Sequence, residues 1–223
     1  MIITYTKEQL KIEVQENQIP VLVMEDPGIF SGFVGSFFLQ SEGEDGNIVL
    51  SDGNKELALS KSSMIVSDYF SLDLNGRKIQ ARLFSQLKEA AADTGIGKED
   101  FTSLGIDLLE KIISASRFDH ITYDLNLEWN DIFKLFGVRI EEDYTSLSEK
   151  ILSLLRVCAQ LLDLKLLAFV NLKSYLSENE VLEVYRMAGY LKLNLLMIES
   201  TERTKLPGEK FYIIDRDKCL IIK

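Results

Sequence analysis

The stretch from Lys165 to Ser200 constrains the fold of this chain most, because two apolar, strand-like runs flank one amphipathic segment. The first run, LKLLAFVN, ends in a polar residue at Asn171, and the second, LNLLMIES, ends at Ser200. The segment between them predicts a helix that begins at SENE. Strands that are apolar on both faces are typical of parallel sheets, and parallel neighbours need a crossover connection. The sequence therefore predicts a βαβ unit within an α/β fold.

A similar strand-to-helix junction lies near the N-terminus, in IPVLVMEDPGIFSGFVG. The apolar run from Val21 to Met24 predicts a central parallel strand. Asp26 and Pro27 then predict the N-cap and the first turn of a helix. Together the two junctions have the arrangement of a P-loop nucleotide hydrolase. We therefore expect a head domain that is a degenerate P-loop-ATPase-like α/β fold.

The chemistry of a nucleotide hydrolase is missing from both junctions. A P-loop needs glycines whose N–H groups face phosphate, a lysine for the phosphate oxygens and a hydroxyl for magnesium. The N-terminal junction offers Gly28, Ser31 and Gly32 without a lysine, and Asp26 would repel phosphate. Asn171 stands where an acidic residue would hold magnesium. A binding function is therefore the first hypothesis, no enzymatic activity is expected, and no catalytic residue is assigned.

The remaining strands of the head are predicted from alternating and apolar patterns. MIITYT and QLKIEVQE predict an edge hairpin, and NIVLSDGNKELALS predicts a second hairpin around Asp52 and Gly53. SSMIVSDYFSLDL is expected to return to the sheet, and FYIID and CLIIK to form a final antiparallel pair. A helix from about Ser146 to Leu162 is expected to cross over before the βαβ unit.

The pattern changes near Asn75, where helical spacing replaces strand alternation. One helix is expected from Gly76 to about Ala92 and a second from about Lys98 to Phe118, joined as an αα-hairpin. This segment is too long for a loop, so it predicts an inserted α-helical leg. The expected domains are a head made of residues 1–75 and 137–223 and a leg made of residues 76–136.

The composition fits a protein of the reduced cytoplasm. The chain has 223 residues, 46% of them hydrophobic, which is enough for a substantial core. It contains no uncharged apolar run long enough to cross a membrane, and its start lacks the regions of a signal peptide. Cys158 and Cys219 lack a metal-binding spacing, and Cys158 is expected to be a buried, inert thiol. His120, the only histidine, is expected to be a surface or hinge residue.

Acidic residues in two nearby segments suggest a divalent-metal site. Asp124, Asn126 and Glu128 alternate, so on an extended strand they would share one face. Asp131 follows, and the Glu141-Glu142 pair is expected at the end of the next strand. These oxygen ligands without histidine or thiolate suit calcium better than magnesium or zinc. The alternative is an acidic strand face that is simply solvated.

Basic residues are grouped along the leg, although the net charge of the chain is −10. The first leg helix carries Arg77, Lys78, Arg82 and Lys88, and Lys134 and Arg139 follow near the end of the leg. An acidic average argues against nucleic-acid binding, unless basic groups line one surface or cations neutralise the carboxylates. Each cation alone would be an ordinary solvated charge. Gathered by oligomer symmetry, these residues would bind a polyanion with a strong salt dependence.

Four segments in the same order resemble the short-type accessory protein of type II-A CRISPR systems. They are VLVMEDPGIFSGFVGSF, FKLFGVRIEED, LLAFVNLKSYLSENEVLEVYRMAGYLKLNLLMIES and EKFYIIDRDKCLIIK. The resemblance as a whole spans nearly the whole chain. Within them, the most specific matches are Glu25, Asp26, Phe30 and Ser31, the strand end Phe169 to Asn171, and the helix start Leu176 to Val181.

This resemblance implies a ring-shaped homotetramer whose subunits each have an α/β head and a helical leg. It implies that calcium binds where leg meets head and that double-stranded DNA enters the ring at its ends, without sequence preference. It also implies a non-enzymatic role in spacer acquisition, beside the CRISPR integrase complex and the effector nuclease. Lys134 and Arg139 flank Gly137-Val138, where the family places basic residues. Asn126 and Asn130 stand where the family has carboxylates.

Two alternatives remain open at the level of sequence. The first is a diverged P-loop NTPase or kinase, which would need a lysine between Gly28 and Gly32 and would show ATP turnover. The second is a protein scaffold of the adaptation machinery without direct DNA binding. Co-purification with another adaptation protein, in the absence of any affinity for DNA, would favour the scaffold.

Overall fold

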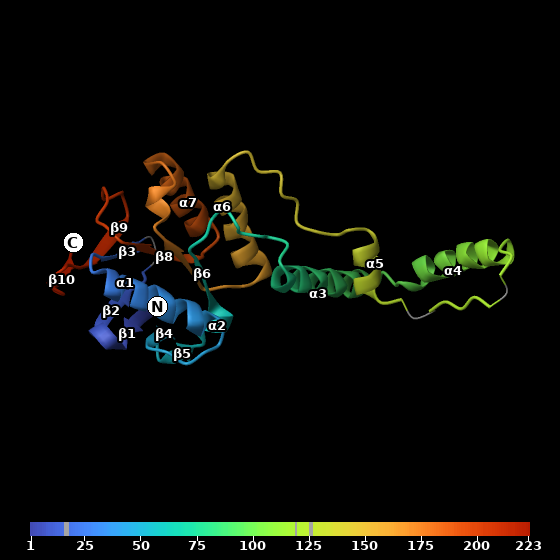
Figure 1. Cartoon of the computed structure of the whole chain (residues 1–223), viewed down its shortest axis with the longest axis horizontal. Helices are drawn as coiled ribbons and strands as arrows, with labels where there is room; N and C mark the ends of the chain where they lie inside the picture. Colours follow the sequence, from blue (N-terminus) through green and yellow to red (C-terminus); the bar gives the residue numbers. More distant parts are fainter. Residues whose placement is uncertain (16–17, 119, 125–126) are drawn as a thin grey trace. The chain divides into compact units, whose positions relative to one another are not determined.

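The computed structural model describes residues 1–15, 18–118, 120–124 and 127–223, which form two compact units. The larger unit contains Met1–Asp73 and Glu142–Lys223, and the smaller unit contains Leu74–Glu141. Figure 1 shows the larger unit as a mixed α/β body and the smaller unit as helices with irregular connections. The predicted α/β class is confirmed. No helix in the described part of the chain is long and apolar enough to span a membrane.

A six-stranded sheet forms the centre of the larger unit, in the order β10-β9-β3-β8-β7-β6. The central strand β3 (Ile19–Met24) pairs in parallel with β8 (Asn194–Glu199) and with β9 (Glu209–Ile214). β8 continues in parallel to β7 (Leu166–Val170), and β7 to β6 (Ser63–Val66). β10 (Leu220–Ile222) pairs antiparallel with β9 at one edge. The predicted βαβ unit, central strand and final antiparallel pair are confirmed.

A second, four-stranded sheet has the order β2-β1-β4-β5. All its pairs are antiparallel, as expected for the two hairpins that the sequence predicts. Its strands are β1 (Ile2–Tyr5), β2 (Leu10–Glu13), β4 (Ile48–Asp52) and β5 (Lys55–Leu57), and a short helical turn, η1 (Thr6–Glu8), joins the first two.

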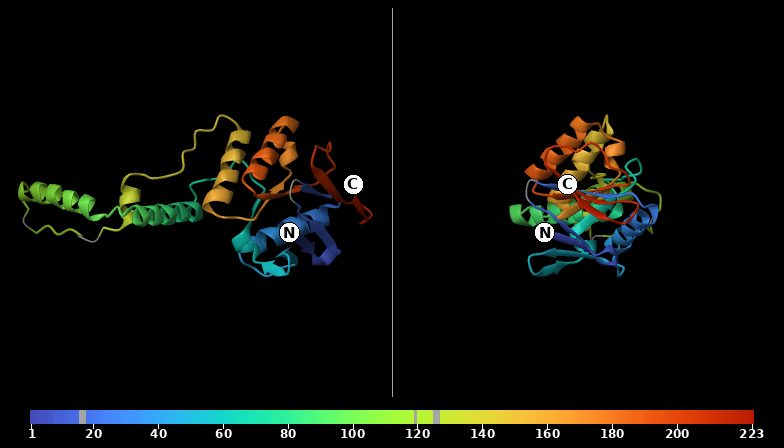
Figure 2. Two further views of the ribbon diagram at one scale, coloured as in Figure 1. Left: turned by 180° about the vertical axis from the view of Figure 1, so that it is seen from behind. Right: turned by 90° about the vertical axis from the view of Figure 1, so that its left-hand side faces the viewer.

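Helices and this second sheet cover the six-stranded sheet on both faces (Figures 1 and 2). α1 (Pro27–Ser41) and α2 (Leu59–Ser62) lie on one side with the four-stranded sheet, and their apolar residues share its core. Tyr5 meets Phe33 of α1 there, with ring centroids 5.1 Å apart. On the other side lie α6 (Leu147–Arg156), its π-helical continuation η2 (Val157–Leu161), and α7 (Glu178–Tyr190).

The three long helices of the larger unit begin at residues whose side chains accept hydrogen bonds from the first turn. Asp26 caps α1 through Ile29 N, as predicted, and Ser146 caps α6 through Glu149 N. Ser177 caps α7 in a reciprocal arrangement with Glu180. A residue that caps the free N–H groups of a first turn contributes about 1 kcal/mol. Local sequence therefore fixes where the main helices of the larger unit begin.

The smaller unit contains α3 (Arg77–Thr94), α4 (Glu99–Ser114) and α5 (Trp129–Leu135). The two predicted leg helices are present, but the expected αα-hairpin is wrong, because α3 packs against α5 rather than against α4. Phe84 of α3 meets Phe133 of α5, with ring centroids 5.3 Å apart. Trp129 stacks on Phe133 within α5, with ring centroids 5.6 Å apart, so the contact between α3 and α5 is built around aromatic side chains.

The strands expected around the acidic segments are also wrong. The described residues between 115 and 146 contain no strand. Ile140 was expected within the second of these strands. Its backbone N–H and C=O instead form hydrogen bonds with the side chain of Asn75, so they do not pair with another strand. The expected shared face of Asp124 and Glu128 therefore has no strand to support it.

Candidate nucleic-acid interface

The five predicted DNA-binding residues all belong to the smaller unit, and all five are exposed. They come from two segments that contain no acidic residue, Leu74–Lys88 and Ile132–Ile140. We call the exposed cations of these segments the basic surface, which consists of Arg77, Lys78, Arg82, Lys88, Lys134 and Arg139. Lys88, the sixth member, was recognised in the sequence and is also exposed.

Asn75 joins the two segments through Ile140, which lies 65 positions further along the chain. Its side-chain nitrogen donates to Ile140 O at 2.9 Å, and its side-chain oxygen accepts from Ile140 N at 2.8 Å. These two bonds place Arg139 next to the start of α3, where Arg77 and Lys78 lie. Sequence reasoning missed Asn75, because one asparagine at a change of pattern gives no signal of so distant a partner.

The first turn of α3 strengthens the positive field of the basic surface. Gly76 occupies the N-cap without a side-chain acceptor, and no acidic residue lies in the first turn. The N-terminus of a helix carries the positive end of its dipole and N–H groups that lack intrahelical partners. With Arg77 and Lys78 at the same place, this end of α3 suits the oxygens of a phosphate backbone.

Within the described residues, the predicted metal ligands do not gather into a site. Asp124, Glu128, Asp131, Glu141 and Glu142 are exposed, and Asn126 lies outside the described residues. Glu128 pairs with Lys98 at 2.7 Å, and Asp131 accepts a hydrogen bond from Glu128 N at the start of α5. In the described part of the chain, no three His, Cys, Asp or Glu side chains lie close enough to hold an ion. The described carboxylates of this chain therefore do not form a calcium site by themselves.

At the N-terminal junction, the carboxylate of Asp26 occupies the start of α1, where a phosphate would bind in a P-loop. Asp26 Oδ1 accepts from Ile29 N at 2.8 Å. Ser31 Oγ donates to Gly28 O at 3.2 Å, so this hydroxyl is bound within the helix. A negative charge at the helix start and the absence of a lysine both disfavour a nucleotide phosphate here.

Asn171 connects the ends of two neighbouring strands. It adopts a left-handed backbone with φ of 54°, its N–H donates to Ile198 O at 2.7 Å, and its Oδ1 accepts from Ser200 N at 2.8 Å. These bonds join the C-terminal ends of β7 and β8. The polar residue that follows the first apolar run thus has a structural role in this fold.

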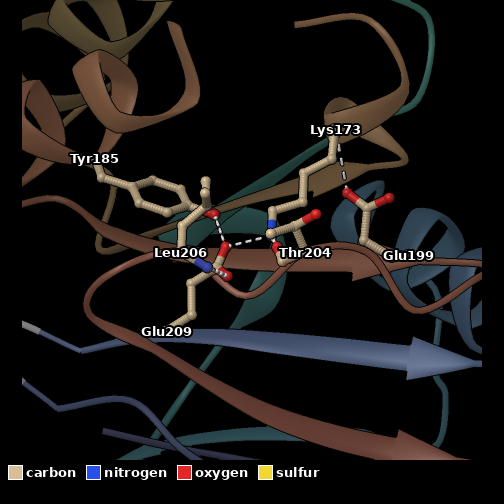
Figure 3. A network of polar contacts seen from close by, with 6 residues as sticks. All are labelled: Lys173, Tyr185, Glu199, Thr204, Leu206 and Glu209. Carbon is tan, nitrogen blue, oxygen red and sulfur yellow. Dashed lines mark hydrogen bonds and ion pairs between the residues drawn. The ribbon is translucent and has the colours of Figure 1, made fainter. Parts of the chain in front are cut away.

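A buried polar network lies close to these strand ends, and sequence reasoning missed it (Figure 3). Lys173 Nζ lies 2.6 Å from Glu209 Oε1, with the side chains 5% and 0% exposed. Lys173 also donates to Thr204 O at 3.0 Å and lies 5.4 Å from the centroid of the Phe211 ring. Glu209 further accepts from Tyr185 Oη and Leu206 N, both at 2.6 Å. The network holds the connection between β8 and β9 against α7.

Glu199 borders this network with one oxygen unsatisfied. Its Oε1 accepts from Lys173 N at 3.2 Å, whereas Oε2 is buried without a hydrogen-bond partner. Burial raises the pKa of the Glu199 carboxyl from 4.5 to about 7, although its contacts with Lys173 oppose the shift. A buried carboxylate that lacks full hydrogen bonding is costly, so the group holds a proton more strongly in the folded chain.

Replacement of Glu199 by glutamine is expected to change how stability depends on pH. Between pH 4.5 and about 7 the folded chain binds this proton more strongly than the unfolded chain, so stability falls as pH rises through that window. Glu199→Gln removes this loss of stability, because the amide does not titrate. The variant should therefore unfold at a higher urea concentration than the parent at pH 8, and the difference in urea midpoint should shrink toward pH 5. Glu202→Gln, at a half-exposed ion pair with Lys223, is the control. An unchanged pH profile in Glu199→Gln would contradict the assignment.

Burial also raises the pKa of the Cys158 thiol, to about 12, and this side chain is fully buried. The expected burial of this cysteine is confirmed, and a thiol with a raised pKa forms less of the reactive thiolate. His120 is exposed, with its ring centroid 6.2 Å from that of Phe118.

Comparison with known proteins assigns the family. The family model described as CRISPR-associated protein (Cas_Csn2) matches residues 40–218. Two curated proteins named CRISPR-associated protein Csn2 are similar along most of the chain. The one from Streptococcus agalactiae is 26% identical over 206 residues, covering 90% of this chain and 89% of its own length. The one from Enterococcus faecalis is 24% identical over 201 residues, covering 88% of each.

A solved structure supports the same fold. The crystal structure of Stu0660 of Streptococcus thermophilus matches with a TM-score of 0.55 and 13% sequence identity, covering 96% of this chain and 75% of that one. At this identity the match speaks for the architecture alone. The family model covers well over half of the sequence, and together with the curated relatives it confirms the resemblance to this family. This chain belongs to the Csn2 family of CRISPR-associated proteins.

Proposed function

We propose that this protein binds the ends of double-stranded DNA without sequence preference, as a ring-shaped homotetramer, during CRISPR spacer acquisition. The observation that carries the proposal is the basic surface, in which two segments free of acidic residues are joined by Asn75. Contacts of arginine and lysine with phosphates give affinity without reading bases.

The ring explains how a chain with a net charge of −10 binds a polyanion. One subunit offers a limited basic surface, whereas four copies around a central hole would add their fields where the duplex passes. Calcium supports binding in this proposal. Because the described carboxylates of one subunit do not gather, the role of calcium rests on the family resemblance, and binding in chelator tests it.

The larger unit serves as a rigid framework in this proposal. We propose that it is a degenerate P-loop-ATPase-like head without enzymatic activity, in which Asp26 caps the helix where phosphate would bind. In the cytoplasm the ring would act beside the CRISPR integrase complex and the effector nuclease. ATP turnover that is lost on substitution of Asp26 or Asn171 would instead favour the NTPase alternative.

The test compares DNA molecules that differ only in having ends. A plasmid is linearised at one site, and its retention by the protein is compared with that of the closed circle, in calcium and in chelator. We expect strong retention of the linear form in calcium, little of the circle, and weaker binding of both in chelator. Equal retention of the two forms would exclude end-dependent loading, and equal binding in chelator would exclude calcium support.

A further inference from the structure

The larger unit connects two parallel strands without a crossover helix. β8 and β9 both pair in parallel with β3, which lies between them, and residues 200–208 connect the two. The structure describes every residue of this connection, and none of them is helical. Parallel strands are ordinarily connected by a dozen or more residues, most often with a helix that covers the sheet. A short connection covers less of the sheet than a helix does, so space remains beside α7.

A cavity of about 1090 Å³ lies beside α7 in this part of the larger unit. One face of α7 forms a wall of the cavity, at the spacing i, i+3, i+4 and i+7, with Leu182, Tyr185, Arg186 and Gly189. The starts of β3 and β8 and the end of the 200–208 connection also line it. Small-molecule sites in proteins have volumes of roughly 300–1,000 Å³, so this cavity has room for a ligand.

Apolar side chains line much of the cavity. Buried Leu193 and Leu195 belong to the lining, at the end of the α7 crossover and the start of β8. Half-buried Ile19 and Leu182 add to it. Ligand sites are ordinarily lined by apolar groups, with a few polar groups that fix the orientation of the ligand. This part of the lining therefore suits the apolar body of a small molecule.

Gln18, which precedes β3, contributes an unsatisfied polar group to the cavity lining. Its Oε1 is buried and has no hydrogen-bond partner within the described residues. Buried polar groups in native proteins are ordinarily paired with the protein or with ordered water. An N–H or O–H group inside the cavity would satisfy this acceptor.

The charged residues of the lining are mostly basic. Lys165, Arg186 and Lys192 are exposed there, against the single acid Asp52. Lys165 lies 2.9 Å from Asp163, which offsets its charge, but the lining keeps an excess of positive charge without it. Basic groups around a cavity raise the local concentration of anions. The charge of the lining therefore favours a ligand with an acidic group.

We propose that this cavity binds a small molecule that has an apolar body, a hydrogen-bond donor and one acidic group. Leu193 and Leu195 contact the apolar body, Gln18 accepts from the donor, and Lys192 attracts the acid. The cavity belongs wholly to the larger unit, whereas the basic surface belongs to the smaller unit. The proposal therefore does not depend on DNA binding.

Two fluorescent probes that differ in one acidic group test this site. 8-Anilinonaphthalene-1-sulfonate has an apolar ring system, an anilino N–H and a sulfonate, and N-phenyl-1-naphthylamine is the same molecule without the sulfonate. In titrations of the full chain without DNA, we expect one saturable site per chain for the sulfonate probe. The neutral probe should bind about tenfold more weakly, because it lacks the attraction to the basic lining. Equal affinity for both probes, or no saturable site, overturns the proposal.

A variant that fills the cavity tests the location of the site. Leu182→Trp places a larger side chain in the cavity and should abolish saturable binding of both probes. Leu152→Trp is the matched control, because Leu152 lines a second groove, of about 500 Å³, between α6 and α7. It should leave both affinities unchanged. Binding that persists in Leu182→Trp, or that is lost in Leu152→Trp instead, overturns the assignment to this cavity.

A charge variant tests the basic lining and keeps the experiment decisive if Leu182→Trp does not fold. Lys165→Gln with Lys192→Gln should weaken binding of the sulfonate probe about tenfold and leave the neutral probe unchanged. Lys7→Gln with Lys61→Gln, at exposed positions outside the lining, makes the same change in net charge and should affect neither probe. An equal effect of the two variants on the sulfonate probe overturns recognition of the acid by this lining.

Discussion

Replacing Arg77, Lys78 and Arg139 together by glutamine is expected to lower the affinity for linear duplex DNA by about tenfold or more at physiological salt. Arg77 and Lys78 lie at the uncapped start of α3, and Asn75 holds Arg139 beside them. Each lost phosphate contact reduces the slope of log affinity against log salt by about 0.9. The slope should therefore fall along with the affinity, and binding should weaken alike for unrelated sequences.

Fluorescence anisotropy with end-labelled duplexes, measured over a series of salt concentrations, gives both quantities. The matched control removes three exposed lysines of the larger unit, Lys7, Lys11 and Lys55, again by glutamine. It changes the net charge equally and should leave the salt slope near that of the parent. An equal loss in both variants would show that total charge governs binding, and no loss in the first would show that the basic surface is not the DNA site.

The second large effect is expected at the buried ion pair. Lys173→Met should lower the free energy of unfolding by about 3–5 kcal/mol, because it leaves the carboxylate of Glu209 charged and unpaired inside the protein. Removal of the lysine also ends its bond to Thr204 O and its contact with the Phe211 ring. Urea unfolding followed by circular dichroism measures the change.

Two variants separate the pair from general effects of losing a lysine. Lys165→Met breaks the exposed pair with Asp163 and should change stability by less than about 1 kcal/mol. Lys173→Met combined with Glu209→Gln removes both charges and should recover part of the loss. If Lys173→Met alone proves as mild as Lys165→Met, the buried pair is not a significant source of stability.

The larger unit could be predicted well because its signals are local. Apolar runs of strand length and turn residues such as Asp52-Gly53 gave the strands of both sheets. Asp26 and Ser177 each act as N-cap through their own first turn, so the sequence alone marks these helix starts. Such features depend on neighbours within a few residues, and tertiary packing did not override them.

The smaller unit was predicted less well because its arrangement depends on distant contacts. The alternation of Asp124 and Glu128 suggested a strand, but a strand needs a partner, and Ile140 pairs with the Asn75 side chain instead. The αα-hairpin failed for a related reason. Phe133 of α5 packs against Phe84 of α3, while Leu104, Leu108 and Ile112 of α4 stay exposed.

The basic residues of the candidate site can be named from the sequence, but the contact that joins their two segments cannot. The sequence identified the cations of the basic surface, whereas Asn75, which joins its two segments, gave no pattern to recognise. The network around Lys173 and Glu209 was also missed, because its members come from β9, α7 and two connecting segments. Its key side chains are charged, and a charge in a sequence is ordinarily assigned to the surface.

The comparison of linear and closed circular DNA tests the central claim most directly. One circle is divided into three samples: intact, cut once, and cut once with both ends blocked by bulky protein caps. A ring that loads at ends should retain only the cut sample with free ends, in calcium, and should release it as salt rises. Equal retention of all three samples would contradict loading of a ring at DNA ends. It would show instead that the protein binds anywhere along the DNA duplex.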